Sequence, residues 1–204
     1  MDDPPLVSSP GRPATILASG SPRRHHLLSL IGLEFEAVPA GIEENPHPAE
    51  GGRAFAQRTA RDKALEVAAH YPDRPVLAAD TVVELDGAIL GKPSSPDDAA
   101  AMLRVLSERT HEVHTGMALV YRGECSCLVD TASVCFNRLE TTAIDWYVGT
   151  GEPLDKAGAY AVQGRGGLFV KAVDGAPSTV VGLPLHRLGE LYADLGLSLL
   201  DLID

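Results

Sequence analysis

The stretch TILASGSPRR (residues 15–24) determines how the chain begins to fold and gives the first indication of a ligand site. TILA is a short apolar run with β-branched residues, typical of a buried strand, and the small residues after it break that strand. A helix is predicted to follow at once, with Ser21 as N-cap and Pro22 at the first helical position. Leu27, Leu28 and Ile31 supply its apolar stripe, which Gly32 ends.

Two arginines in the first turn of this helix, Arg23 and Arg24, are unusual. The helix macrodipole is positive there, so each cation is unfavourable by a few tenths to about 1 kcal/mol. A bound anion reverses the sign, because backbone amides, the hydroxyls of Ser19 and Ser21 and two guanidinium groups together form a phosphate cradle. A capped helix with two solvated arginines explains the same residues equally well, so the stretch alone leaves both interpretations open.

Length and charge limit the classes of function. With 204 residues the chain is long enough for one large α/β domain. The net charge of -11 and the sequence pI near 5.0 argue against binding to duplex nucleic acid, so a phosphate ligand should be small and locally recognised. Residues 1–13 are polar and Pro-rich and are predicted to be a disordered leader, and residues 14–204 are predicted to form a single domain without repeats.

Three cysteines, Cys125, Cys127 and Cys135, bear on the cellular compartment. Their number is odd, and the sequence has neither a signal peptide nor an apolar run long enough to span a bilayer, so a cytoplasmic protein with no membrane association is predicted. No second pair of ligands stands at a metal-binding distance from Cys125 and Cys127. Buried strand thiols are therefore predicted rather than a zinc site.

A long amphipathic helix is predicted over about residues 49–70, with a buried face of small and apolar residues at i, i+3 and i+4 spacing. Lys63 falls on that same face, one turn from Thr59 and from Val67. Either its aliphatic stem runs along the core or its ammonium group points into a polar cleft, and the sequence leaves both open.

The run PVLAADTVV (residues 75–83) gives the strongest signal for a buried strand, and Asp80 interrupts it. Burying this carboxylate without a partner would cost several kcal/mol, so Asp80 should be paired, protonated or bound to a cation. A strand end with a local bond to the backbone is the structural alternative, but Val82 and Val83 continue the run. Asp86-Gly87 then predicts a hairpin, which returns the chain past the same region and delivers Lys92.

The order of the remaining elements supports a mixed central sheet flanked by helices, that is, an α/β fold. The strand at 35–39 is followed by a loop that carries Glu43 and Glu44, a typical position for ligand-binding carboxylates. Further elements are predicted as a helix at 95–106, strands at 111–121 and 128–136, a helix at 142–148, a strand at 168–173 and a helix from 184 to 195.

The segment HEVH (residues 111–114) resembles a metal-binding sequence but does not favour one. It lacks the i, i+4 spacing of histidines on a helix, and at strand spacing His111 and His114 point to opposite faces. A metal site built on these two histidines is therefore not expected.

The unusual charged residues form a chemically coherent set for a nucleoside triphosphate with a divalent metal. Cationic side chains and a hydroxyl suit phosphate oxygens, whereas carboxylates suit a hard cation such as Mg or Mn or a water molecule. No Ser/His/Asp or Cys/His arrangement is evident, which favours direct attack by water over a covalent intermediate. The residues that suit phosphate oxygens are Ser19, Arg23, Arg24, Lys63 and Lys92, and the carboxylates that suit a cation or a water molecule are Glu44 and Asp80.

These residues lie in motifs that closely resemble the Maf family of nucleoside triphosphate pyrophosphatases. The resemblance implies an α/β fold with a deep cleft, like that of inosine triphosphate pyrophosphatases, and metal-dependent hydrolysis of a nucleoside triphosphate to the monophosphate and pyrophosphate. The matching stretches are LASGSPRR (17–24), IEE (42–44), residues 58–64, AADTVV (78–83), LGKP (90–93), HTG (114–116), GEPLDKAGAYAVQG (151–164) and VVGLPL (180–185).

Carried over by motif, Asp80 is the expected proton acceptor, with Glu44 at the metal and Ser19, Arg23, Lys63 and Lys92 around the phosphates. Arg24, Thr81 and Gln163 match the positions that distinguish the substrate subgroups of the family. They resemble the subgroup that acts on dTTP and UTP and, by extension, on modified pyrimidine nucleotides. The Gln163 amide suits a pyrimidine, because it can donate to O4 and accept from N3–H. Two other functions remain open: a regulator of septum formation that binds nucleotide without turnover, and a pyrophosphatase that prefers 7-methyl-GTP. An apolar-rich surface could support a homodimer.

Overall fold

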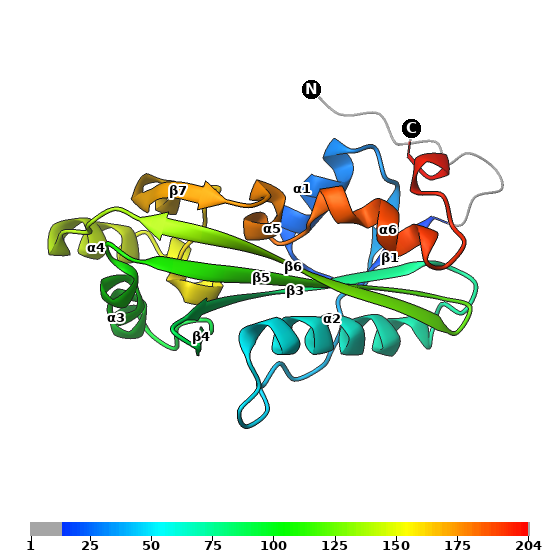
Figure 1. Ribbon diagram of the computed structural model, residues 1–204, viewed down its shortest axis with the longest axis horizontal. Helices are drawn as coiled ribbons and strands as arrows, with labels where there is room; N and C mark the ends of the chain where they lie inside the picture. The colour runs from blue at the N-terminus through cyan, green and yellow to red at the C-terminus, as the bar shows by residue number, and fades with distance from the viewer. Residues whose placement is uncertain (1–13, 204) are drawn as a thin grey trace.

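The computed structural model describes residues 14–203, which form a mixed seven-stranded sheet with helices on both faces (Figure 1). The strand order is β2-β1-β3-β5-β6-β7, and β4 pairs with β3 off this path. The strands are β1 (Thr15–Leu17), β2 (Phe35–Ala37), β3 (Val76–Leu85), β4 (Ala88–Leu90), β5 (Thr110–Tyr121), β6 (Glu124–Phe136) and β7 (Val170–Asp174). The α-helices are α1 (Pro22–Leu30), α2 (Gly52–Ala68), α3 (Pro96–Leu106), α4 (Thr141–Val148), α5 (Pro177–Val181) and α6 (Leu188–Ala193).

The central strand β3 is buried on both faces, which explains why its sequence is apolar without alternation. Val76 and Ala78 pack in a cluster with residues of α2. Leu77 and Ala79, which point the other way, pack in a cluster with residues of α1 and α6. Figure 1 accordingly shows α2 on one side of the sheet and α1, α5 and α6 on the other. The predicted α/β class, a mixed sheet flanked by helices, is confirmed.

The backbone of α2 approaches the sheet closely at Gly116 in the middle of β5. A Cβ placed on Gly116 would lie 2.2 Å from the carbonyl oxygen of Ala56 in α2, far inside van der Waals contact. Only glycine allows the helix to sit this near the sheet, and the helix in turn carries Lys63 against β3. The glycine of the HTG motif thus contributes to positioning the site.

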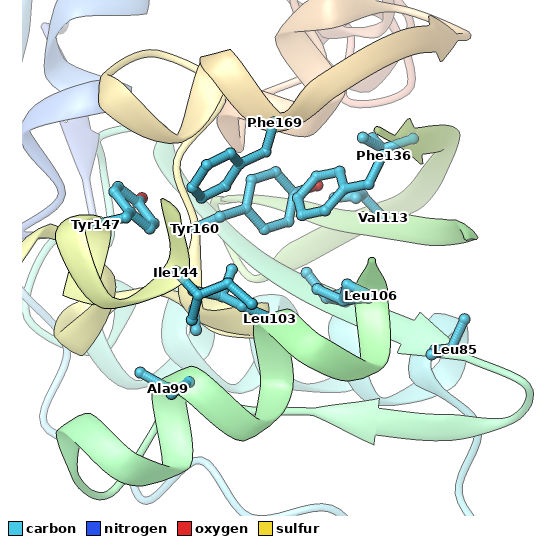
Figure 2. Close-up of a cluster of buried hydrophobic side chains, with 14 residues drawn as sticks. Leu85, Ala99, Leu103, Leu106, Val113, Phe136, Ile144, Tyr147, Tyr160 and Phe169 are labelled. Atoms are coloured by element: carbon cyan, nitrogen blue, oxygen red, sulfur yellow. The ribbon is translucent and has the colours of Figure 1, made fainter. Parts of the chain in front are cut away.

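A second core fills the end of the sheet under α3 and α4 (Figure 2). Its aromatic rings meet edge to face, with ring centroids 4.8 Å apart between Phe136 and Tyr160 and 5.0 Å apart between Tyr147 and Phe169. Tyr147 comes from α4, whereas Tyr160 and Phe169 come from the segment between α4 and β7. This packing fixes a segment with little regular structure of its own beside the middle of the sheet.

The sheet has a notch on one side of β3. Strand β1 pairs with β3 only at Val76 and Leu77, and β4 pairs with it only from Val83 onward. Between these points β3 keeps its partner β5 but has no strand on its other side within residues 14–203. Asp80 and Thr81 therefore lie at an open edge beyond the carboxyl end of β1, the type of crevice in which α/β folds bind ligands.

The N-cap positions of α1 and α3 and the hairpin turn were predicted correctly, although the Ser21 side chain makes no capping hydrogen bond. Helix α3 spans Pro96–Leu106, and Ser95 caps it by accepting a hydrogen bond from the Asp98 amide, 3.1 Å away. Asp86 and Gly87 have positive φ angles of 51° and 80°, as a two-residue hairpin turn requires. The other predicted helices and strands are present, with ends shifted by a few residues.

Three predictions were wrong in detail. Strand β6 begins at Glu124 rather than at residue 128, because the turn before it has only two residues and pairing with β5 continues up to that turn. The cysteines lie on β6, but Cys125 is exposed and Cys127 and Cys135 are only half-buried, so they are not the buried thiols that were predicted. The final helix is also shorter, because residues Leu185–Arg187 form a 3-10 turn before α6.

Three other predictions concern the leader, membrane association and the cellular location. The predicted leader, residues 1–13, lies outside the described residues, so the division into a leader and one domain stays a prediction. No helix in the described part of the chain is long and apolar enough to cross a membrane. The cytoplasmic location stays a prediction.

Candidate active site

The notch beside β3 opens into a cavity of about 700 Å³, a size typical of sites for small molecules. Its lining comes from the loops after β1, β2 and β4, from the first turn of α1, from α2, β3, β5 and α5, and from the segment between α4 and β7. Every site residue predicted from the sequence lines this one cavity: Ser19, Arg23, Arg24, Glu44, Lys63, Asp80, Thr81, Lys92 and Gln163.

Lys63 connects the two predicted carboxylates. Its Nζ donates to Asp80 Oδ1 at 2.8 Å and lies 2.8 Å from Glu44 Oε1. The side chains of Lys63 and Asp80 are each 9% exposed, whereas that of Glu44 is 39% exposed at the mouth of the cavity. Lys63 hydrogen bonding and nearby cations hold the pKa of Glu44 below its usual value against the opposing effect of burial. Of the two alternatives left open for Lys63, the ammonium group in a polar cleft is the one observed.

Arg24 is held in place by three acceptors. Its Nε donates to the Gly182 carbonyl at 2.8 Å, Nη1 to Ser19 Oγ at 3.1 Å and Nη2 to Thr81 Oγ1 at 3.2 Å. Burial lowers the pKa of the guanidinium group, and Asp80 opposes that shift. A guanidinium has five N–H donors, so two remain for a ligand in the cavity. Arg24 is therefore an ordered group that joins α1, β3 and the end of α5, and not a solvated cation.

The segment that carries Gln163 is organised by Glu152. Its carboxylate accepts hydrogen bonds from Tyr147 Oη at 2.9 Å, from the Arg165 amide at 3.2 Å and from the Gly166 amide at 3.1 Å. These bonds hold the pKa of Glu152 below its usual value although burial opposes them. Tyr147 belongs to the packed core under α4, so the loop that presents Gln163 to the cavity is tied to rigid structure.

Lys92 and Lys156 face the cavity from two loops that contact each other. The amide of Gly158 donates to the carbonyl of Gly91, the residue before Lys92, at 3.1 Å. Gly158 has a φ of 67°, and a Cβ there would lie 3.0 Å from Val83, so this close packing requires glycine. Lys156 was missed from the sequence, although its place next to Asp155 between two Gly-rich stretches was a usable signal. Its Nζ donates to the Glu152 carbonyl at 2.9 Å.

The charge of the cavity is opposite to that of the whole chain. Five cationic and three anionic side chains line the cavity, in a chain whose net charge is -11. The net negative charge of the chain repels anions at long range, whereas the cations of the cavity attract them at short range. The cavity therefore favours a small ligand whose negative charge is concentrated in one place. Phosphate groups meet this requirement. The five cations are Arg23, Arg24, Lys63, Lys92 and Lys156.

A family model described as Maf-like protein matches residues 14–195. The chain belongs to the Maf-like protein family. The residues matched include every element that lines the cavity, so the family relationship covers the site as well as the scaffold. The resemblance inferred from the sequence motifs is confirmed.

Three relatives of this Maf-like chain share one name. A dTTP/UTP pyrophosphatase of Myxococcus xanthus is 48% identical over 90% of this chain and 93% of its own length. Proteins of the same name from Anaeromyxobacter dehalogenans (strain 2CP-C) and Escherichia coli O157:H7 are each 49% identical, over 92% and 87% of this chain and 96% and 91% of theirs. Among solved structures, a HAM1 protein from Coxiella burnetii superposes with a TM-score of 0.47 at 17% identity, covering 88% of this chain and 98% of its own.

Proposed function

We propose that this Maf-like chain hydrolyses a nucleoside triphosphate, dTTP or UTP, to the nucleoside monophosphate and pyrophosphate. The observation that carries the proposal is the buried contact of Lys63 with Asp80, with Glu44 at the cavity mouth as a second partner of Lys63, placed at the open edge of β3 in a cavity lined by further cations. An acid next to ordered cations is what metal-assisted phosphate hydrolysis requires. The names of the relatives support the same reaction.

In the proposed reaction Asp80 accepts the proton of a water molecule that attacks the α-phosphorus. The bond between that phosphorus and the bridging oxygen breaks, and pyrophosphate leaves with the bonding electrons. Asp80 Oδ1 accepts from Lys63, which orients the carboxylate and leaves Oδ2 for the water. Arg23, Lys92 and the remaining N–H groups of Arg24 bind the phosphate oxygens and stabilise the charge that develops on the leaving group.

The donor set also fits a divalent cation. Lys63 Nζ marks a point that carboxylate oxygens of both Glu44 and Asp80 reach at 2.8 Å, so the two acids converge on one position. Hard oxygen ligands of this kind suit Mg²⁺ or Mn²⁺. When bound, the cation would neutralise negative charge on the triphosphate. Glu44, which is the more exposed of the two acids, would turn toward it from the cavity mouth.

Selection of the base is assigned to Arg24, Thr81 and Gln163. The first two are hydrogen-bonded to each other at 3.2 Å, and Gln163 lines the same cavity. The Gln163 amide can donate to O4 of uracil or thymine and accept from N3–H, an order of acceptor and donor that the adenine edge reverses. Guanine offers O6 and N1–H in the same order, but it is a larger base with an additional amino group beside N1–H. A pyrimidine triphosphate is therefore the proposed substrate class.

The test is pyrophosphate release from dTTP and UTP in the presence of Mg²⁺. Asp80→Asn should lose at least about 100-fold in kcat, because general-base catalysis contributes on that order or more. Asp86→Asn is the matched control: Asp86 is 73% exposed at the hairpin after the same strand and should leave the rate unchanged. Undiminished turnover by Asp80→Asn would show that Asp80 does not accept the proton.

The two other functions are not favoured by the relatives, which are named as dTTP/UTP pyrophosphatases. A panel of triphosphates separates them from the proposal. A chain that only binds nucleotide would release no pyrophosphate from any member of the panel. Faster turnover of 7-methyl-GTP than of dTTP or UTP would show that Gln163 does not select pyrimidines.

A further inference from the structure

A second group of ligand atoms lies outside the cavity, beneath the first turn of α2. It consists of Glu84 on β3 and of Glu112 and His114 on β5, and the three offer ligand atoms that all lie within 4.8 Å of one another. Glu84 and Glu112 are direct partners in the β3–β5 ladder, and His114 is one pair further along, opposite Val82. Alternate residues of a strand share a face, so the sheet register itself brings the three side chains together.

His114 is buried and points an unpartnered nitrogen into this group. The residue is 4% exposed, and its Nε2 lies 3.8 Å from Glu84 Oε2 and 3.8 Å from Glu112 Oε2, too far for a hydrogen bond to either. Within residues 14–203, Nε2 has no hydrogen-bond partner, whereas Nδ1 contacts Thr131 Oγ1 at 2.9 Å. One imidazole nitrogen and two carboxylates that face one another without a direct hydrogen bond place three ligand atoms around one position, as a bound cation requires.

The surroundings orient His114 as a metal ligand. Thr131 Oγ1 also accepts from Arg53 Nη1 at 3.1 Å, and its two lone pairs allow it to accept from His114 Nδ1–H as well. We assign this tautomer, which directs the Nε2 lone pair at Glu84 and Glu112. A metal-binding histidine is typically fixed in this way through its other nitrogen.

We propose that Glu84, Glu112 and His114 form a binding site for a first-row divalent transition metal ion, Zn²⁺ above all, separate from the catalytic cavity. One imidazole and two carboxylates suit Zn²⁺, which takes three protein ligands and a water molecule in tetrahedral geometry. Ligand atoms around Zn²⁺ stand about 3.4 Å apart, so the present spacing needs only side-chain adjustment. The Glu112 side chain, 53% exposed, has the freedom to move inward.

Such a site would tie the start of α2 to the sheet. Glu84 Oε2 already accepts from the Gly52 amide, the first residue of α2, at 2.6 Å. The catalytic cavity is not lined by Glu84, Glu112 or His114, although Val82, two residues before Glu84 on β3, lines it. An ion here would stabilise the helix that carries Lys63 without contacting the substrate.

The test measures Zn²⁺ binding in a background that lacks all three carboxylates of the catalytic cavity, Glu44→Gln with Asp80→Asn and Asp155→Asn. After treatment with a chelator, this protein should bind one equivalent of Zn²⁺ in competition with a chromophoric chelator, and Zn²⁺ should raise its melting temperature. Adding Glu112→Gln should weaken binding at least about tenfold, since even indirect supports of a metal ligand contribute this much. Glu66→Gln, which changes an exposed carboxylate on α2, is the matched control and should bind as the background does.

Spectroscopy distinguishes the proposed ligands from adventitious binding. Co²⁺ in place of Zn²⁺ should give the intense visible absorption of a low-coordinate site, and the ¹⁵N resonance of His114 Nε2 should shift on Zn²⁺ addition. Both signals should need at least about tenfold more metal ion in Glu112→Gln, whose exposed side chain can change without loss of the fold. No Zn²⁺ binding in the background protein, or equal binding with and without Glu112, would overturn the proposal. Neither result depends on whether the chain hydrolyses dTTP or UTP.

Discussion

Replacing Lys63 by methionine tests the central ion pair of the site. Methionine keeps an unbranched apolar side chain that matches the stem of lysine but has no ammonium group, so the carboxylate of Asp80 loses its 2.8 Å partner. With its side chain 9% exposed, Asp80 has little access to water that could replace the lysine. Glu44 loses the same partner, but at 39% exposure it is hydrated.

The expected cost follows from these exposures. Removing one partner of a buried ion pair costs about 3–5 kcal/mol, because an uncompensated charge stays behind. The partly solvated contact to Glu44 adds at most about 1 kcal/mol. Arg24 attracts the Asp80 carboxylate and offsets part of the loss. We therefore expect Lys63→Met to lower the free energy of unfolding by about 3 kcal/mol.

The assay is urea unfolding followed by circular dichroism, in EDTA and without nucleotide, so that no cation replaces the lysine. Combining Lys63→Met with Asp80→Asn should restore about 2 kcal/mol relative to Lys63→Met alone, because the buried charge is then gone. Lys171→Met, at an exposed position on β7, is the control and should stay within about 0.5 kcal/mol of the parent chain.

Additive costs of the two substitutions would show that Lys63 does not stabilise Asp80. If the costs of Lys63→Met and Asp80→Asn summed to that of the double variant within about 0.5 kcal/mol, the two groups would not be energetically coupled. A cost below about 1 kcal/mol for Lys63→Met would likewise mean that Asp80 is compensated by water or by other cations. In either case the contact would not fix the orientation of Asp80.

Three further predictions concern the scaffold. Gly116→Ala should lower the free energy of unfolding in urea by more than about 3 kcal/mol, because its Cβ would overlap the Ala56 carbonyl; a near-neutral result would mean that α2 can shift without penalty. Hydrogen bonding to Arg58 lowers the pKa of Glu50 to about 2, so the folded state loses stability as pH falls from about 4.5 toward 2. In Glu50→Gln the free energy of unfolding, measured in urea at each pH, should fall by about 1 kcal/mol less over this range. An unchanged pH dependence would contradict the role of the Glu50–Arg58 pair. Ser95→Ala should cost about 1 kcal/mol in the same urea assay through loss of the α3 cap, and no change would mean that water replaces the hydroxyl.

Much of the fold could be predicted because local rules act within a few residues. The limits of α3 followed from Ser95 and the proline after it, and the β3–β4 turn followed from Asp86-Gly87. Errors arose where pairing decided instead. Polar residues at the start of β6 gave no strand signal, yet that strand begins at Glu124 because β5 opposes it. The same pairing leaves Cys125 exposed near the end of the hairpin.

The chemical inventory of the site was also predictable. An acid inside an apolar run and a lysine on the buried face of a helix are each costly alone, so their presence indicated that Asp80 and Lys63 needed partners. Which partners they found was not predictable, because the two residues lie 17 positions apart and meet only when α2 packs on β3. For Arg24 the separation is greater still, since its acceptor Gly182 is 158 residues away.

The sequence by itself determined the α/β class, most of the elements and the set of charged residues that needed a ligand or a partner. Hydrophobic periodicity, helix caps and turn residues encode this information locally. Only the tertiary structure decided that Arg24 is an ordered link between three elements, and that Glu84 and Glu112 converge on His114. These outcomes depend on strand register and helix placement, which bring together atoms from segments that no local rule connects.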